Sequence, residues 1–446
     1  MREYQSKMMY KPIKFTPPQF LALIFICLVT LGGLLLKLPF ATEKEISWID
    51  AFFISTSAAT VTGLATLDIG STFTLFGEIV IMLLIQIGGI GVMAFAVLVV
   101  IMLGKKIGMK QRLLMQEALN QPSLGGVIRL VRNLFIFVFI MELLGVIFLA
   151  IKWVPEMGWA KGLYYSLFHT IAAFNNAGFA LWPDNLSRFV GDPIVNLVIT
   201  TLIMTGGLGF TVVFDLYYQR RFKKLSLHSK VMLISTLIVN VLAILAIFAF
   251  EYSNSNTLGK LSASEKIWAA YFQGITPRTA GFNTIDIASL EQPTLMLMLL
   301  LMFVGAGSTS TGGGIKLTTF IVIVFAVINF IKGKEEIIIF NRTIRNQILF
   351  RALAILSISI LFIFIATMLL TFTEDAGLMP ILFEVVSAFG TVGLSMNFTP
   401  HLSSLGKIII IFIMFLGKMG PLTLVYSISK PEKTKVRYPD GELFTG

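Results

Sequence analysis

Four glycines recur along the chain, each in a similar short loop: Gly63, Gly178, Gly281 and Gly393. An aromatic residue stands ten positions before each glycine, and a large apolar residue follows it directly. Glycine tolerates positive φ, so such loops can turn successive backbone carbonyls toward one axis. In potassium filters, rings of carbonyl oxygens from four loops replace the water around a dehydrated K⁺ ion. The pattern predicts a potassium-selective filter built from four segments of one chain.

The expected ion-binding residues are those of the four loops, whose carbonyl and hydroxyl oxygens would line the axis. The fourth loop has the Thr-Val-Gly sequence of potassium channel filters. Arg278 lies in the third loop, three residues before Gly281, where an inward-facing cation would repel K⁺, so we expect it to point behind the filter toward a carboxylate. The expected filter residues are Thr60, Val61, Thr62, Gly63, Asn175, Asn176, Ala177, Gly178, Thr279, Ala280, Gly281, Thr391, Val392 and Gly393.

Each loop lies between a short apolar segment and a long one, and another long apolar segment begins each unit. The short segments have about 11 residues, so as helices they rise about 16 Å, half of a bilayer core of about 30 Å. We expect them to enter the membrane and return. The first long helices are expected at 18–40, 131–152, 230–250 and 350–372. The half-helices are expected at 48–59, 163–174, 264–275 and 379–389, and the returning helices at 74–103, 190–217, 292–331 and 405–427.

A second glycine cluster lies in each returning segment, at 88–91, 206–209, 305–308 and 417–420. The first two indicate close helix packing through small residues. The third belongs to a run of glycine, serine and threonine at 305–314, where a single helix over 292–331 should break. A broken backbone at membrane depth must line a cavity, so we expect a gate here, with a simple flexible kink as the alternative. The expected gate residues are Gly305, Gly307, Ser308, Thr309, Ser310, Thr311, Gly312, Gly313, Gly314, Lys316 and Lys418.

The composition fits a membrane protein, with 56% hydrophobic and only 13% charged residues, against roughly 25% charged in soluble domains. Lys and Arg gather between alternate apolar segments, so the positive-inside rule places both termini in the cytoplasm. Membrane spans separate these basic clusters, which makes a nucleic-acid surface implausible. Cys27 is the single cysteine, so one chain has no disulfide framework. We expect an all-α membrane protein of four M1–pore helix–M2 repeats around one central pore.

The expected organisation follows from these segments. Repeat 1 spans 18–103, repeat 2 with its cytoplasmic linker spans 104–218, and repeat 3 spans 219–331 and includes the loop 305–314. Repeat 4 spans 332–427. A cytoplasmic N-terminus at 1–17 and a cytoplasmic tail at 428–446 complete the chain.

These loops and repeats resemble the Trk/Ktr/HKT superfamily of potassium transport proteins, most closely the KtrB group of bacterial Ktr membrane subunits. The resemblance covers residues 18–446 and implies that the four loop glycines confer K⁺ selectivity, with K⁺ as the transported ion. Plant relatives with serine in the first filter favour sodium, and Gly63 sets this chain apart from them. The 305–314 segment resembles the intramembrane gating loop of the family.

The resemblance also implies a homodimer in the bacterial cell membrane, regulated by a cytoplasmic ring of separate nucleotide-binding subunits similar to KtrA. No nucleotide-binding motif occurs in this sequence, so no cofactor is expected on the chain itself. The C-terminal segment 438–446 is expected to pack at the dimer interface.

Two other functions are considered. A K⁺ secondary transporter coupled to Na⁺ or H⁺ would also have repeats and broken helices, but such repeats are often inverted, and these four run in the same direction. An enzyme is disfavoured because the sequence has no His-Glu-x-x-His or Gly-x-Ser-x-Gly motif. Glu142, Asp215 and Glu384 look like isolated acids without a matching base.

Overall fold

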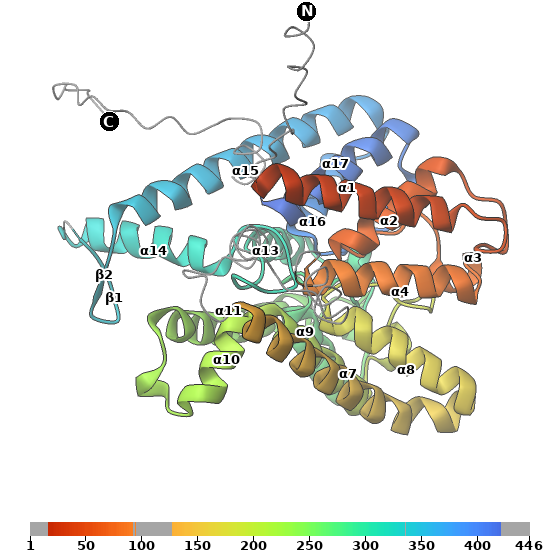
Figure 1. The fold of residues 1–446 in the computed structure, drawn as a ribbon, viewed down its shortest axis with the longest axis horizontal. Helices are drawn as coiled ribbons and strands as arrows, with labels where there is room; N and C mark the ends of the chain where they lie inside the picture. The colour runs from red at the N-terminus through yellow and green to blue at the C-terminus, as the bar shows by residue number, and fades with distance from the viewer. Residues whose placement is uncertain (1–16, 92–93, 95–126, 335, 421–446) are drawn as a thin grey trace, which may run out of the picture.

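A computed structural model describes residues 17–91, 94, 127–334 and 336–420 of the 446-residue chain (Figure 1). The expectations for residues 1–16, for most of the first linker and for the 428–446 tail fall outside the described residues. The ends of two expected returning helices, at 95–103 and 421–427, also fall outside them.

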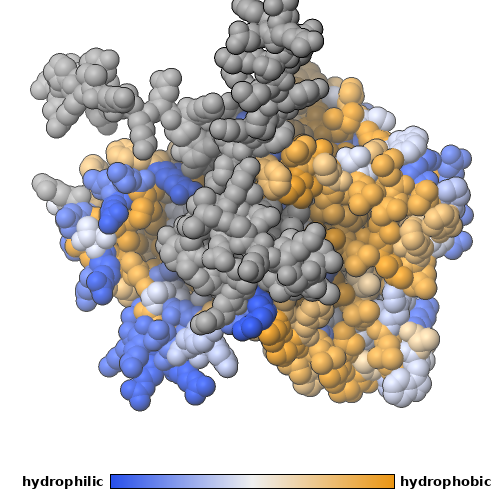
Figure 2. Space-filling model, in the orientation of Figure 1, coloured by the Kyte–Doolittle hydropathy of each residue, from blue (hydrophilic) through white to orange (hydrophobic). Residues whose placement is uncertain are grey.

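Four long apolar helices begin the four units. Each has the length and hydropathy to cross a membrane, and between 22% and 33% of each span is buried in the protein, so most of its surface is free to meet lipid. In Figure 2, apolar residues cover much of the visible face, with hydrophilic residues at its left end and along its right edge. The prediction of a helical membrane protein is confirmed. These helices are α1 (Pro17–Leu36), α7 (Val127–Met157), α11 (Leu227–Glu251) and α15 (Asn346–Thr373).

A half-helix follows each long helix and packs against it. Two of the half-helices begin with a serine cap: Ser47 accepts a hydrogen bond from the Asp50 amide, and Ser262 forms a capping box with Glu265. With 13 or 16 residues each, none is long enough to span a bilayer. They are α2 (Trp48–Thr60), α8 (Trp159–Phe174), α12 (Ala263–Ile275) and α16 (Leu378–Gly390).

The returning helices end where the second glycine clusters begin to turn the chain. Gly91, Gly209 and Gly420 follow three of these helices, with φ of 98°, 97° and 82°, a conformation that L side chains avoid. After Gly209 the chain continues as α10 (Phe210–Gln219), bent by 94° from the preceding helix. The expected continuous helix over 190–217 is therefore wrong. The returning helices are α4 (Leu75–Ile90), α9 (Pro193–Leu208), α13 (Gln292–Phe303) and α17 (Ser404–Met419).

The third unit breaks as expected, between α13 and α14 (Leu317–Ile331). After α14 the chain forms a hairpin of β1 (Ile337–Ile339) and β2 (Arg342–Ile344), visible at the left of Figure 1. The all-α expectation therefore needs this one addition within the described residues. The short elements are α3 (Ile69–Thr72), η1 (Ser187–Phe189), η2 (Phe222–Lys224), η3 (Leu258–Lys260), η4 (Ile287–Ser289) and η5 (Thr399–His401).

The four units close into a ring through their returning helices. Each returning helix packs against the half-helix of the next unit: α4 against α8, α9 against α12, α13 against α16, and α17 against α2. The contact from α17 to α2 joins the last unit to the first. Four units that contact one another in this cyclic order surround one axis, and the half-helices direct their C-terminal ends toward it.

Glycine allows the returning helices to come this close. A methyl group on Gly88, Gly206 or Gly417 would collide with a backbone carbonyl of the half-helix in the same unit. The carbonyls belong to Ala59, Phe174 and Phe389, each four residues before a loop glycine. The packing expected for the first two clusters is therefore confirmed, and the fourth cluster packs in the same way.

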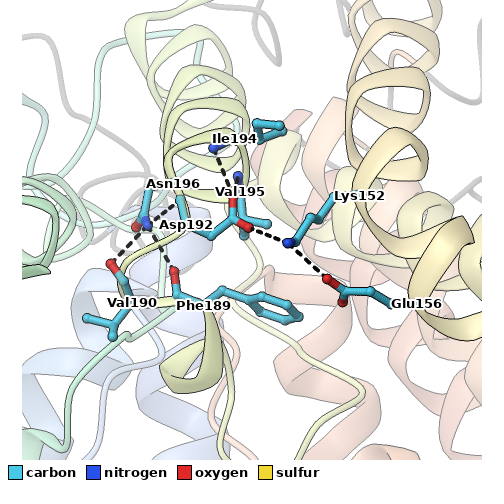
Figure 3. A network of polar contacts seen from close by, with 8 residues as sticks. All are labelled: Lys152, Glu156, Phe189, Val190, Asp192, Ile194, Val195 and Asn196. Atoms are coloured by element: carbon cyan, nitrogen blue, oxygen red, sulfur yellow. Dashed lines mark hydrogen bonds and ion pairs between the residues drawn. The ribbon is translucent and has the colours of Figure 1, made fainter.

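Polar contacts fix the other ends of the helices, as Figure 3 shows for the second unit. Asp192 caps α9 by accepting hydrogen bonds from the amides of Ile194 and Val195. Its carboxylate also lies 3.1 Å from Nζ of Lys152, which pairs with Glu156 on α7. One aspartate therefore starts the returning helix and joins it to the long helix of its unit.

Candidate ion pathway

The four loop glycines meet at the centre of the ring. All four have positive φ, at 94°, 67°, 77° and 92° in chain order. A methyl carbon added to Gly178 would lie 2.7 Å from Cα of Gly281, and one added to Gly393 would lie 3.0 Å from Cα of Gly63. The glycines are thus cyclic neighbours, which brings segments more than 300 residues apart in sequence to one place.

Carbonyl oxygens alternate with the glycines around this ring. A methyl group on each glycine would collide with the carbonyl oxygen that precedes the glycine of the next unit. No side chain fits at these positions without displacing an oxygen. The oxygens belong, in order, to Ala177, Ala280, Val392 and Thr62.

The residue two positions before each glycine also has positive φ, at 52°, 58°, 64° and 49°. In all four loops, two residues with left-handed backbone conformation therefore flank one intervening residue. These residues end or follow the half-helices, so the loops share a backbone plan although their side chains differ. They are Val61, Asn176, Thr279 and Thr391.

The first and fourth loops share a further support. The amides of Gly63 and Gly393 donate to the hydroxyls of Ser57 and Ser387, at 3.0 and 3.1 Å. Each serine stands six residues before its glycine. Alanine and isoleucine occupy the matching positions of the second and third units, so the ring has fourfold backbone symmetry with unequal side-chain support.

Some side chains of the predicted filter lie away from the axis. The Thr60 hydroxyl donates to the Thr56 carbonyl of its own helix and contacts the Thr62 hydroxyl at 2.6 Å. Asn175 donates to Gln86 and to Glu142. For Thr60 and Asn175, only the backbone remains available to an ion, because their side chains are held by groups behind the loops.

Glu142 is therefore not isolated, contrary to the interpretation from the sequence. It accepts hydrogen bonds from Gln86 on α4 and from Asn175 at the second filter loop. Glu384 accepts from Ser395 and Thr399, which follow the fourth loop, and Asp215 accepts from Ser226 and Ser229. All three acids hold loops or helix ends, and sequence spacing gave no sign of these partners.

The segment 304–316 lies at the end of the ring nearest Asn176, Thr279 and Thr391, which we call the inner end. Gly313 donates to the Thr391 hydroxyl at 2.8 Å, and the Thr311 hydroxyl donates to Asn176 at 3.0 Å. Asn176 in turn donates to Thr279 at 3.4 Å. The predicted gate residues therefore donate hydrogen bonds to two of the four filter loops, and Asn176 links them to a third.

Backbone hydrogen bonds fix the same segment to the ends of two returning helices. Gly307 donates to the Gly207 carbonyl at 2.8 Å, and Thr311 donates to the Gly206 carbonyl at 3.3 Å. Gly314 donates to the Gly417 carbonyl at 3.3 Å. The broken ends of α9 and α17 leave these carbonyls without helical partners, and the loop supplies the missing donors.

Two half-buried lysines complete the attachment. Nζ of Lys418 donates to the Thr311 carbonyl at 2.7 Å, and Nζ of Lys316 donates to the Gly312 carbonyl at 2.5 Å. Both ammonium groups therefore hold adjacent carbonyls of the loop. A cationic donor forms a stronger hydrogen bond than a neutral one, so these contacts favour the conformation in which the loop lies beneath the ring. Ser308, Thr309 and Ser310 precede these two carbonyls in the loop, and the Thr309 hydroxyl contacts that of Thr211 on α10.

Arg278 lies behind the third loop, as expected, but its predicted carboxylate partner is wrong. Its Nη1 donates to the side-chain oxygen of Asn240 on α11 at 3.1 Å. No carboxylate of the described residues forms an ion pair with it. The guanidinium is buried, so an amide replaces the expected counter-charge.

Comparison with known proteins places this geometry in a family. The sequence matches the family described as "TrkH: Cation transport protein" over residues 18–438. It is 56% identical to "Ktr system potassium uptake protein B" of Bacillus subtilis, over 99% of both chains, and 42% identical to the protein of that name from Vibrio alginolyticus, over 96% of this chain and 95% of the other.

The fold is similar to a crystal structure of the potassium transporter TrkH from Vibrio parahaemolyticus. The TM-score is 0.74 at 18% sequence identity, over 94% of this chain and 86% of that one. The matching family and the sequence relatives are cation transport proteins, not enzymes. The chain belongs to the TrkH family of cation transport proteins.

Proposed function

We propose that this chain is the translocating subunit of a bacterial K⁺ uptake system, as the names of its relatives suggest. The observation that carries the proposal is the closed ring of four positive-φ glycines and four carbonyl oxygens. Such a ring replaces the hydration shell of K⁺. The C-terminal ends of the half-helices add partial negative charge that favours a cation there.

The segment 305–314 is proposed as the gate. Its hydrogen bonds to Asn176 and Thr391 hold it across the inner end of the ring, where it obstructs an ion that leaves the filter. Movement of the loop requires release of the lysine contacts and of the backbone bonds to α9 and α17. Because α14 follows the loop directly, a protein bound beyond α14 has a mechanical connection to it.

The remaining parts of the proposal concern the assembly. The chain would act as a homodimer in the bacterial cell membrane, with both termini in the cytoplasm. A ring of separate nucleotide-binding subunits would regulate it, because the chain has no nucleotide motif of its own. The name "Ktr system" of two relatives supports a transport system with more than one component.

The test is K⁺ uptake by a K⁺-deficient bacterial strain that expresses the chain with and without the regulatory subunit. Reversal potentials of the purified chain in bilayers then separate a channel from a coupled transporter. A channel-like pathway predicts a reversal potential set by the K⁺ gradient alone. A shift with the Na⁺ or H⁺ gradient would favour ion-coupled transport, and no K⁺ flux in either assay would contradict the proposal.

A further inference from the structure

A small cavity lies behind the third filter loop. Its volume is about 20 Å³, enough for one water molecule. Its walls come from four parts of the fold: Arg278 at the filter, Asn240 and Thr236 on α11, Met204 on α9, and Ala306 in the gate loop. A particle in this cavity therefore contacts both the filter support and the gate.

The polar groups around the cavity with unused hydrogen-bonding capacity can all donate. Nε of Arg278 and the Thr236 hydroxyl are buried without a partner among the described residues. The amide nitrogen of Asn240 has only a 3.8 Å contact with the Met204 sulfur, while its oxygen already accepts from Arg278. The arrangement offers three donors to whatever lies in the cavity, and the side-chain acceptor beside them is already occupied.

The charge of the site points the same way. Arg278 is 7% exposed, and within the described part of the chain it has no ion pair. A buried charge without a partner is costly, and within a membrane it is usually compensated. A neutral water could accept from these donors, but the positive charge of the guanidinium would remain.

We propose that this cavity binds one monovalent anion of about the size of chloride. A halide accepts hydrogen bonds from all three donors and neutralises the guanidinium. The cavity is too small for phosphate or a carboxylic acid. The flexible Met204 side chain can adjust to an ion slightly larger than water. The bound anion would lower the positive potential that Arg278 imposes on the filter. It would also pack against Ala306 and so keep the gate loop in its observed position.

The experiment uses the full-length chain in proteoliposomes at constant K⁺, with chloride replaced stepwise by gluconate on both sides. Gluconate is far too large for the cavity. K⁺ flux should fall several-fold as chloride is removed and recover when bromide is added. This inference rests on the proposed K⁺ function. Flux that is absent in every anion would contradict that function, and the bromide crystals described below would then test the anion site independently.

The variant Thr236→Val removes one donor and preserves the side-chain shape. One hydrogen bond to an ion contributes about 1.5 kcal/mol or more, so the half-saturating chloride concentration should rise about tenfold. Thr294→Val is the matched control, because Thr294 on α13 is also buried with an unpartnered hydroxyl but does not line the cavity. Its chloride dependence should equal that of the unaltered chain.

Crystals grown in bromide give a direct second measurement. An anomalous peak between Arg278 and Thr236 is expected, and it should weaken in Thr236→Val. The absence of a peak, with flux equal in chloride and gluconate, means that the cavity holds water and overturns the proposal. A peak accompanied by anion-independent flux would equally overturn the proposed link between the anion and permeation.

Discussion

Lys418 offers the sharpest test of the gate, because a single side chain of α17 holds the loop by one hydrogen bond, from Nζ to the Thr311 carbonyl at 2.7 Å. The variant Lys418→Met removes the donor and keeps an unbranched side chain. A hydrogen bond to a charged group contributes about 1.5–3 kcal/mol, and burial of the ammonium offsets part of this. At the lower end, the closed-to-open equilibrium shifts roughly tenfold, since 1.4 kcal/mol is a factor of ten.

K⁺ flux into proteoliposomes that contain the chain alone is the assay. Flux should rise by up to about tenfold in Lys418→Met, because the closed arrangement loses about 1.5 kcal/mol. Lys407→Met is the matched control: it alters a lysine of the same helix, whose ammonium pairs with Asp50 at 2.7 Å, away from the loop. Its flux per folded protein should be unchanged.

A rise in flux has a second explanation, in which Lys418 is only an electrostatic barrier to K⁺. A chain that lacks residues 308–311 separates the two, because the Thr311 carbonyl is then absent. If the lysine holds the loop, Lys418→Met adds little flux in the shortened chain. If it acts as a barrier, flux rises in both backgrounds. An unchanged flux in the full-length Lys418→Met protein would refute the reasoning altogether.

Three further predictions concern the ring, the loop and the packing. Gly63→Ser and Gly393→Ser should each weaken K⁺ affinity and discrimination against Na⁺ in uptake assays, because a side chain displaces a ring carbonyl; unchanged selectivity in both would be contrary to the filter proposal. Removal of residues 308–311 should raise flux in vesicles and make it insensitive to the added regulatory ring, and a shortened chain that still responds fully would mean that the loop is only a kink. Gly417→Ala should lower the free energy of unfolding by about 1–3 kcal/mol in a thermal denaturation assay, because its methyl group meets the Phe389 carbonyl. Gly377→Ala, whose methyl group would have only one neighbour, at 3.7 Å, is the control; it should destabilise the chain less than Gly417→Ala, because it alters only the N-cap of α16.

The helical framework was predictable because apolar runs and glycine positions mark it strongly. The expected half-helix at 48–59 is α2 (Trp48–Thr60), and the expected break in 292–331 falls between α13 and α14. Long runs of apolar residues have no stable alternative to helices in a membrane. Five glycines within ten residues likewise leave little helix propensity at the third break.

The bend at Gly209 was missed because its sequence, Gly-Gly-Leu-Gly, satisfies the requirements of close helix packing as well as those of a helix end. Gly206 does pack against a carbonyl, while Gly209 takes positive φ and turns the chain. Composition alone does not separate these two uses of glycine. The gate loop favours the helix end, because its backbone amides donate to the Gly206 and Gly207 carbonyls that the end of α9 exposes.

Side-chain partners were the least predictable part of the site. Arg278 was expected to meet a carboxylate and instead meets Asn240, 38 residues earlier on a different helix. Asn175 was expected among the ion-binding residues, yet its side chain lies in a network with Gln86 and Glu142. Such contacts depend on how four units pack against each other, which no local sequence pattern specifies.

The central claim is that K⁺ passes between the glycines of the four loops. Thallium replaces K⁺ at such sites and scatters X-rays anomalously, so crystals grown in thallium salts test the claim most directly. We predict an anomalous peak on the axis, surrounded by the carbonyls of Thr62, Ala177, Ala280 and Val392, and its loss in Gly393→Ser. Thallium bound elsewhere in the protein with no density inside the ring would contradict the account.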